Sequence, residues 1–356
     1  MRFQGKKLTV QVFGQSHGEA IGAVIDGLPA GVRVDQERLN ALMRRRAPGQ
    51  GAHTTARREP DIPEFVSGLA DGISCGAPVT VLIRNRDARS GDYASLRDIP
   101  RPSHADWPAF VKYGPAHDGR GGGVFSGRLT APLCAAGAIA LQMLADRQVF
   151  VGAHIAEIAG IPDDPFDPVG LKPEDLAAPG QKSFPVCSDG AGAEMLSAIE
   201  DARRDGDSVG GVVECASLGL PVGLGGPLFE GLESALASAL FAIPAVRGVS
   251  FGKGFEAARM RGSAHNDPLL VADGRIVTST NRAGGLQGGM TNGMPLLVNV
   301  AFKPTPSIAL PQRSVSLSRM QPAELIISGR HDPCVVPRAV PVVESMVALV
   351  LLDQLL

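Results

Sequence analysis

Short apolar blocks, separated by glycine and proline, run along the whole chain. The blocks at 8–13, 79–83, 149–158 and 296–302 are bounded by turn-forming residues and predict buried strands. Apolar residues at helical spacing follow the candidate N-cap Asp35 and recur at 232–240, which predicts two amphipathic helices. Longer apolar stretches at 129–144 and 342–356 predict two more buried helices. The pattern therefore predicts an α/β (α+β) protein.

One segment lacks this periodicity. Residues 162–182 are rich in proline and aspartate, and we expect them to form a surface loop or excursion. No linker-like stretch divides the chain, so we predict a single domain over residues 1–356.

An internal repeat relates the two halves. Residues 17–24 are echoed by 205–212, and each copy runs through a short apolar strand into GLPxG and then a helical pattern. The repeat units lie near 8–46 and 205–243 and predict a pseudo-two-fold fold, although chance similarity of glycine and aliphatic residues is the alternative. His17 in one copy aligns with Asp205 in the other, as expected if only one half carries this group.

Composition narrows the classes of function. The 356 residues are 44% hydrophobic and carry a formal charge of −2, which excludes the basic excess of a non-specific nucleic-acid binder. Glu344 and Asp353 interrupt the apolar C-terminal stretch, so we expect a buried helix and no membrane span. The first residues lack a signal-peptide pattern. Five cysteines without CxxC spacing favour a reducing cytoplasm and no metal site.

The stretch RPSHADWPAFVKYGPAHDGRGGGVFSGR, residues 101–128, combines the means to bind an anion and to move a proton. Glycines 121–123 are flanked by Arg120 and Arg128, so backbone N–H groups and guanidinium groups can approach an anion closely. His104 can exchange a proton near neutral pH. The segment predicts a phosphorylated ligand, and an ordinary histidine-bearing surface turn is the alternative.

Further candidates lie outside that stretch. His17 follows Ser16 in FGQSHG at the end of a strand, where it either faces a ligand or sits in a surface turn. Arginines 44–46 end a helical pattern and can simply cap it, but three successive side chains cannot share one face, so we expect at least one to enter a cavity. Arg330 and Asp332 in GRHDP offer an anion contact and a proton relay, or form a helix-entry ion pair.

In their joint order these motifs resemble the chorismate synthase family. The resemblance is carried by FGQSHGEAIGAVIDGLPAG, RRRAPGQGAHTTARREPD, RPSHADWPAFVKYG, KGFEAARMRGSAHND, TNRAGGLQGGMTNGMP with AFKPTPSI, and GRHDPCVVPRAVPVVESM. It implies a β-α-β sandwich, a cytoplasmic homotetramer and use of reduced FMN. It also implies loss of phosphate and a ring hydrogen from 5-enolpyruvylshikimate 3-phosphate by 1,4-elimination, giving chorismate for aromatic amino acid synthesis. The class implied is a carbon–oxygen lyase acting on phosphates.

The resemblance also implies roles for individual residues. His17, supported by Ser16, would protonate and stabilise the reduced flavin, His104 would be the general acid toward phosphate, and Asp332 would assist at the flavin. Anionic groups would be held by Arg45, Arg46, Arg128 and Arg330. The FMN contacts implied are Val124, Phe125, Ser126, Ala245, Gly288, Lys303, Pro304, Thr305, Pro306, Ser307 and Arg330.

The chain departs from the common family pattern after the glycine run. Val124 and Phe125 stand where many relatives have arginine and serine, so we expect altered contacts with retained activity. Ala47, Ala52 and His53 stand where further arginines are common, which favours an external flavin reductase with NADPH only as an outside source of electrons. Two other classes stay open: an FMN-dependent NAD(P)H oxidoreductase and a non-catalytic flavin-binding assembly protein.

Overall fold

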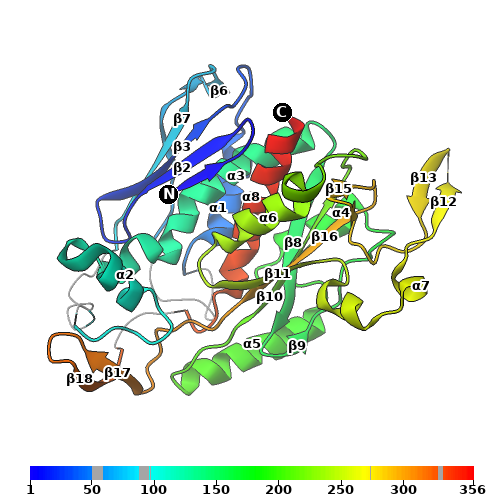
Figure 1. Cartoon of the computed structure of the whole chain (residues 1–356). Helices are drawn as coiled ribbons and strands as arrows, with labels where there is room; N and C mark the ends of the chain where they lie inside the picture. Colours follow the sequence, from blue (N-terminus) through cyan, green and yellow to red (C-terminus); the bar gives the residue numbers. More distant parts are fainter. Residues whose placement is uncertain (50–58, 88–95, 97, 273, 328–331) are drawn as a thin grey trace.

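Two antiparallel sheets enclose a layer of helices (Figure 1). The computed structural model describes residues 1–49, 59–87, 96, 98–272, 274–327 and 332–356. Within them, both halves of the chain contribute to one continuous hydrophobic core. The two halves of the chain therefore share one core.

The first half of the chain forms one five-stranded sheet in the order β1-β2-β3-β7-β4. Its strands are β1 (Arg2–Gln4), β2 (Thr9–Gly14), β3 (Ala20–Asp26), β4 (Glu64–Ser67) and β7 (Val79–Arg84). Helix α3 (Thr130–Ala145) packs on β2, β3 and β7, and helix α1 (Gln36–Arg46) packs against α3. Asp35 caps α1 as predicted, because its carboxylate accepts from the N–H groups of Glu37 and Arg38.

The second half repeats this arrangement in the order β9-β8-β10-β16-β11. Its strands are β8 (Phe150–Ile158), β9 (Ile161–Pro162), β10 (Gly211–Leu218), β11 (Val246–Phe251) and β16 (Leu296–Phe302). Helices α6 (Leu232–Phe241) and α8 (Val336–Leu355) correspond to α1 and α3. The predicted sandwich with a pseudo-two-fold repeat is confirmed.

Smaller elements decorate this frame. They are β5 (Leu69–Ala70), β6 (Ile73–Ser74), α2 (Asp106–Tyr113), α4 (Pro173–Ala177), α5 (Asp189–Arg204), α7 (Gly262–His265), β12 (Leu269–Ala272), β13 (Arg275–Thr278), β14 (Leu286–Gln287), β15 (Met290–Thr291), β17 (Gln312–Ser316) and β18 (Gln321–Leu325). The predicted C-terminal helix begins earlier, at Val336, because Pro337 lies in the first turn, where no N–H is needed.

The same glycine turn follows β3 and β10. Gly27 and Gly219 have φ of +91° and +80°, and a Cβ at either would lie 2.0 and 2.1 Å from the carbonyl oxygens of Lys7 and Gln148. Only glycine fits both constraints, which explains the repeated GLPxG.

The strand pairing corrects one detail of the repeat. The equivalent turns at Gly27 and Gly219 align β3 with β10, so Ile21, six residues before Gly27, matches Val213, six residues before Gly219. The two residues pair with Gly14 and Ile155 in their sheets. By this register the counterpart of His17 is Val209. Asp205 is the C-cap of α5 instead, so the predicted alignment of His17 with Asp205 is wrong by four residues, the separation of Asp205 from Val209.

Helices α3 and α8 cross in contact at the centre of the sandwich. A Cβ on Gly137 would lie 2.2 Å from the Ser345 Cβ and 2.5 Å from its Cα. Nearer their beginnings the Cys134 Sγ donates to the Pro341 carbonyl at 3.7 Å. The contact nearer the start of α3 is also the one nearer the start of α8, so α3 and α8 run parallel.

The helical stretch Gly127–Ala145 is long and apolar enough, by length and composition alone, to cross a membrane. Its most apolar window is 83% buried inside the fold, which is typical of a core helix.

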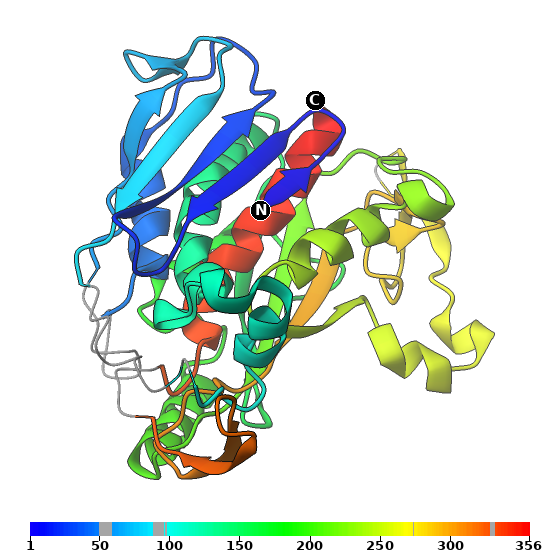
Figure 2. The same cartoon turned by 60° about the vertical axis from the view of Figure 1, so that its left-hand side comes forward.

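The N-terminal strands are attached to the end of α8. The Asp353 carboxylate accepts the backbone N–H groups of Lys6, Lys7 and Leu8 at 2.8, 2.7 and 2.8 Å. Figure 2 shows β1 beside the C-terminal part of this helix. The contact ties the first sheet to the central helix of the second half.

The segment 162–182 is more ordered than predicted. It contains β9 and α4, and it buries Phe166 and Leu176 against the second sheet. Beneath it, His154 Nδ1 lies 2.9 Å from Asp163 and Nε2 lies 2.8 Å from Glu214. Burial alone would lower the pKa of His154, but its hydrogen bonds outweigh burial and raise that pKa to about 11. A cationic His154 therefore links the segment to β8 and β10.

This cluster includes Cys187, and the ligand atoms of His154, Asp163 and Cys187 lie within 4.8 Å of one another. The Asp163 carboxylate already accepts the backbone N–H groups of Cys187 and Ser188 at 2.6 and 2.9 Å. We interpret the group as a structural ion cluster, because its hydrogen bonds are internally satisfied.

Gly137→Ala should destabilise the protein by about 1–3 kcal/mol, because the added methyl group would push α3 and α8 apart. Gly190→Ala in α5 is the matched control, since its Cβ would come no nearer than 3.8 Å to another heavy atom. Chemical denaturation of both variants measures the effect. Equal stability of the two would contradict the close helix contact.

Candidate functional site

A cavity of about 700 Å³ opens where α3 and α8 begin. Thr130 lines it from the first residue of α3, and Arg338 and Val342 line it from the first turns of α8. Arg46 reaches it from the end of α1. Two helix N-termini at one end of a cavity favour an anionic ligand, because their unpaired N–H groups carry partial positive charge.

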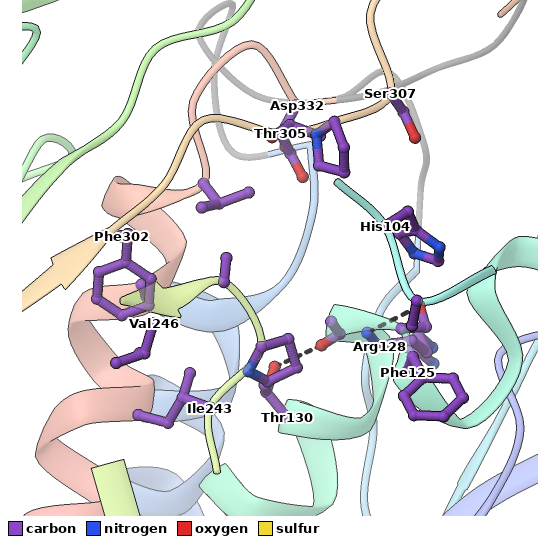
Figure 3. Close-up of a pocket in the computed structure, with 18 of the residues that line it drawn as sticks. His104, Phe125, Arg128, Thr130, Ile243, Val246, Phe302, Thr305, Ser307 and Asp332 are labelled. Carbon is purple, nitrogen blue, oxygen red and sulfur yellow. Dashed lines mark hydrogen bonds between the residues drawn. The ribbon is translucent and has the colours of Figure 1, made fainter. Parts of the chain in front are cut away.

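The two halves of the chain give the cavity unlike walls. Ile243, Val246 and Phe302 form an apolar wall from the segments after α6 and in β16. Across the cavity lie His104, Phe125 and Arg128, as Figure 3 shows. Asp332, Thr305 and Ser307 lie together at a third side in the same view.

Asp61 joins two of the predicted anion-binding arginines. Its carboxylate accepts from the guanidinium groups of both Arg46 and Arg128, and the three side chains are almost fully buried. Arg46 also donates to Thr130 Oγ1 at 3.1 Å and to the Gly127 carbonyl at 3.0 Å. The carboxylate therefore connects the end of α1 to the start of α3.

Burial opposes ionisation of Asp61, but the charges of Arg46 and Arg128 outweigh it and lower the pKa of Asp61. A second carboxylate supports the group, because Glu59 lies 3.8 Å from Arg128 and accepts the backbone N–H of Asp87 at 3.1 Å. The two arginines are thus held in fixed positions at the cavity wall.

His104 lies on the same side of the cavity as Arg128 (Figure 3) and is held by its neighbours. Its Nδ1 lies 2.6 Å from the Asp106 carboxylate, and Arg101 donates to the same carboxylate through Nε and one terminal nitrogen, at 2.7 and 2.8 Å. Burial is the main cause that lowers the pKa of His104, and the charge of Arg101 adds to it, while Asp106 opposes the shift. The free site therefore favours a neutral imidazole.

The triple glycine makes room for His17. Gly121, Gly122 and Gly123 all have positive φ, and a Cβ on Gly121 would lie 2.5 Å from His17 Nε2 and 2.9 Å from Ser16 Oγ. The Ser16 N–H donates to the Gly123 carbonyl at 3.2 Å. Glycine is required here because the run packs directly on the histidine that follows β2.

Asp332 reaches the cavity just before α8. It accepts from Arg338 at 2.6 Å, and Arg338 in turn donates to the Arg46 carbonyl at 3.2 Å. Burial lowers the pKa of Arg338, against the opposing effect of Asp332. This pair links the wall built by α8 to the wall built by α1.

Three buried polar atoms at the site have no hydrogen-bond partner among the described residues: Ser16 Oγ, Thr305 Oγ1 and one terminal nitrogen of Arg128. Leaving such atoms unsatisfied costs free energy, so a polar ligand is expected to complete those of Thr305 and Arg128, which line the cavity. A planar aromatic ring system suits the apolar wall, and phosphate suits the arginines. The residues present therefore fit a flavin nucleotide together with a phosphorylated substrate.

Most of the site residues predicted from the sequence meet at this cavity. Its lining includes His17, His104, Asp332, Val124, Phe125, Ser126, Ala245, Lys303, Thr305, Pro306, Ser307, Arg46 and Arg128, and Ser16 lies behind Gly121. As expected, one of the three successive arginines, Arg46, enters the cavity, while Arg44 is exposed.

Besides Ser16, four predicted residues are not among the described residues that line the cavity. Arg45 forms a bidentate pair with Glu344 at 2.7 and 2.8 Å, so its guanidinium braces α1 against α8. Gly288 lies at the turn between β14 and β15, and Pro304 is absent from the lining. Arg330 lies outside the described residues. The expected ligand contacts of Arg45, Gly288 and Pro304 gain no support from this geometry.

Sequence reasoning missed the residues that hold the predicted ones in place. They are Glu59, Asp61, Arg101, Asp106, Thr130 and Arg338. The sequence held a signal for some of them. The motif RREPD contains Glu59 and Asp61, and the motif RPSHAD contains Arg101 and Asp106 close to His104. The partners of Asp61 and Thr130 are distant in sequence, so only the fold identifies them.

Comparison with known proteins agrees with this geometry. The family model described as chorismate synthase matches residues 8–356. The chain is 51% identical to a chorismate synthase of Thermococcus gammatolerans (99% of this chain, 97% of the relative) and 45% identical to one of Korarchaeum cryptofilum (99% and 96%). A solved structure titled "Crystal Structure of Chorismate Synthase" is 28% identical, with a TM-score of 0.77 over 99% of this chain and 92% of that chain.

Asp61→Asn should lower the free energy of unfolding at pH 7 by about 3–5 kcal/mol, because it removes the charge that two buried guanidinium groups share. The pKa of Asp61 is lowered in the folded protein, so its contribution is present at neutral pH and is lost as the pH falls through that lowered pKa. Denaturation of both proteins at pH 7 and pH 3 measures this, and the difference should shrink at pH 3.

Asp201→Asn serves as the control, because Asp201 pairs with Arg204 on the exposed face of α5. Its stability should match that of the wild type within about 0.5 kcal/mol. An Asp61→Asn protein as stable as this control would show that Asp61 does not hold the arginines.

Proposed function

Because the chain belongs to the chorismate synthase family and has the function for which its relatives are named, we propose that this cavity converts 5-enolpyruvylshikimate 3-phosphate to chorismate. The reaction is a 1,4-elimination of phosphate and a ring hydrogen, which makes the protein a carbon–oxygen lyase of the shikimate pathway. The observation that carries this proposal is the meeting of His17, His104 and Asp332 with the arginine-rich wall in one cavity.

The substrate carries a phosphate and two carboxylates. Arg46, Arg128 and Arg338 present guanidinium groups at the wall where α3 and α8 begin, and a planar guanidinium can hold a carboxylate or phosphate through two parallel hydrogen bonds. Asp61 keeps the first two arginines at fixed positions, so little ordering is needed when the anion binds.

Reduced FMN is the cofactor that we propose for this cavity. When bound, it supplies transient electron donation that helps expel the phosphate. Ile243, Val246 and Phe302 would pack on its ring system, and Lys303, Thr305 and Ser307 would reach its polar groups. Val124 and Phe125 line the same cavity, so apolar packing replaces the arginine and serine that many relatives have there.

His17 and His104 divide the handling of protons. His104 lies beside Arg128 at the cavity (Figure 3), where its imidazole can give a proton to the leaving phosphate. His17, packed under the glycine run beside Ser16, would stabilise the reduced flavin. Asp332, fixed by Arg338, would assist removal of the ring hydrogen.

The partners follow from the same assignment. We propose a cytoplasmic protein that uses no nucleic acid or membrane partner and receives electrons from an external flavin reductase, with NADPH as their source. We also propose a homotetramer. The hairpin β12–β13 supports it, because Leu269, Val271 and Ile276 are exposed on an arm that projects from the body (Figure 1).

Under anaerobic conditions with chemically reduced FMN, the purified protein should form chorismate and phosphate in equal amounts without any nicotinamide. His17→Ala and His104→Ala should each lower kcat by about 10²–10⁴-fold, because each removes a group that handles a proton. Chorismate absorbance and phosphate release measure the rates.

His265→Ala is the control for these variants, because His265 ends α7 and is not among the residues that line the cavity. Nicotinamide oxidation without phosphate release would instead identify an oxidoreductase. Full activity of both cavity variants would contradict the proton-handling roles of His17 and His104.

Replacing Val271 and Ile276 with aspartate should dissociate the tetramer, because charged groups would be buried at the interface of the hairpin. Light scattering after size exclusion measures the mass, and circular dichroism checks the fold. A tetramer that survives both substitutions would contradict a role of β12–β13 in assembly.

A further inference from the structure

The segment that carries His104 is held by unusually many contacts. Arg101 and Asp106 face each other across the turn, and the guanidinium binds both oxygens of the carboxylate. Arg101 also donates to Ser307 Oγ at 3.2 Å, so the turn is attached to the segment that follows β16. Both side chains of the pair are more than nine-tenths buried.

The residue before His104 is strained. Ser103 has φ of +58°, in the left-handed region that side chains with a Cβ adopt at a cost. Its carbonyl accepts from Lys303 Nζ at 2.6 Å. A strained conformation persists only where surrounding contacts enforce it, and here the contacts come from both sides of the turn.

These contacts fix which nitrogen of the imidazole faces the cavity. Nδ1 lies 2.6 Å from a carboxylate oxygen and 3.0 Å from an Arg101 nitrogen, which can only donate. The shorter contact is to the acceptor, so Nδ1 carries a proton. The other ring nitrogen, Nε2, lies beside Gly122. A Cβ on Gly122 would lie 3.5 Å from Nε2, so the glycine leaves this side of the imidazole open.

We propose that Arg101 and Asp106 are positioning residues that hold His104 as the Nδ1–H tautomer and present Nε2 to the departing phosphate. The proposal rests on the proposed function for the identity of the phosphate, but the tautomer itself is a property of the protein alone. In this arrangement the Asp106 carboxylate stabilises the imidazolium that must form before a proton can be donated.

The proton balance follows from the charges that face His104. Arg101 on its own segment and Lys303 from beyond β16 both disfavour the imidazolium, and Asp106 favours it. Burial also lowers the pKa of His104, so the imidazole is neutral in the free site. Binding of the phosphate dianion must therefore be accompanied by uptake of a proton from solvent, which makes the imidazole cationic.

His104 alone then supplies the proton that leaves with the phosphate, while the electron pair of the ring C–H bond, whose hydrogen is removed with the assistance of Asp332, forms the new carbon–carbon double bond. As the carbon–oxygen bond breaks, the phosphate keeps the bonding electron pair and one of its oxygens takes the Nε2 proton. The imidazole returns to the neutral Nδ1–H form, still bound to Asp106. Binding of substrate should therefore be accompanied by uptake of a proton, and that proton leaves with the phosphate.

The direct test is the tautomer of His104 in the full-length protein labelled with ¹⁵N-histidine. The His104 signal, assigned by its loss in His104→Gln, should show a protonated Nδ1 at pH 7.5. In Asp106→Asn the ring should shift toward the commoner Nε2–H tautomer. Identical His104 signals in the two proteins would overturn the proposal, whether or not the protein makes chorismate.

The kinetic test compares Asp106→Asn with Asp201→Asn, an exposed control on α5. Asp106→Asn should lower kcat by about 10–100-fold with little change in KM and should move the alkaline limb of the kcat–pH profile to lower pH, because the imidazolium loses its carboxylate. Flavin absorbance should show unchanged FMN binding.

Each outcome has a distinct meaning. Chorismate formation by the wild type with an unmoved pH profile in Asp106→Asn would refute the positioning role and leave the proposed function intact. No chorismate from the wild type would refute the proposed function, while the tautomer measurement would still decide the role of Asp106. Proton uptake on substrate binding, measured by calorimetry in two buffers, should fall in Asp106→Asn and stay unchanged in Asp201→Asn.

Discussion

The contact of α3 with α8 at Gly137 and Ser345 is the constraint on which this structure depends. The lack of a side chain on Gly137 lets the two backbones approach closely, and the contacts of Gly137 with Ser345 and of Cys134 with Pro341 show that the helices run parallel. Parallel helices begin at the same end. Their N-termini, and the turns that precede them, therefore meet and form one cavity from both halves of the chain.

Positive charge is concentrated where the two helix N-termini meet, which favours anion binding but costs free energy. Two helix N-termini and a set of arginines would repel one another in a buried space, so each cation is balanced by a carboxylate. Asp61 serves Arg46 and Arg128, Asp106 serves Arg101, and Asp332 serves Arg338. The ion pairs leave donor groups directed at the cavity, where an anionic ligand can complete them.

The pseudo-symmetry also explains how one fold binds two unlike ligands. Equivalent positions at the ends of α1 and α6 carry Arg46 in one half and Ala242 with Ile243 in the other. At these positions the first half therefore presents a cation to the cavity and the second half an apolar surface. A duplicated frame with divergent ends can thus place a planar ring beside a phosphorylated substrate.

Much of the fold followed from the sequence because strand and helix formation depends on local apolar spacing. The strands near 8–13 and 296–302, the Asp35 cap and the GLPxG turns were predicted for that reason. The segment 162–182 was misjudged, because Phe166 and Leu176 have no local period and are ordered only by the sheet beneath them. The register of His17 was also misjudged, because strand pairing was needed to align the two halves.

The sequence by itself determined the elements, the repeat and the residue types that carry the chemistry, since glycine runs, arginines and histidines in motifs are local features. Only the tertiary structure decided which arginine enters the cavity, which carboxylate holds it, and which nitrogen of His104 faces the ligand. Those choices depend on contacts between residues that are far apart in the chain, such as Arg45 with Glu344 and Arg46 with Thr130. Electrostatic pairing and packing act over a few ångströms in space, and distance along the chain does not reveal them.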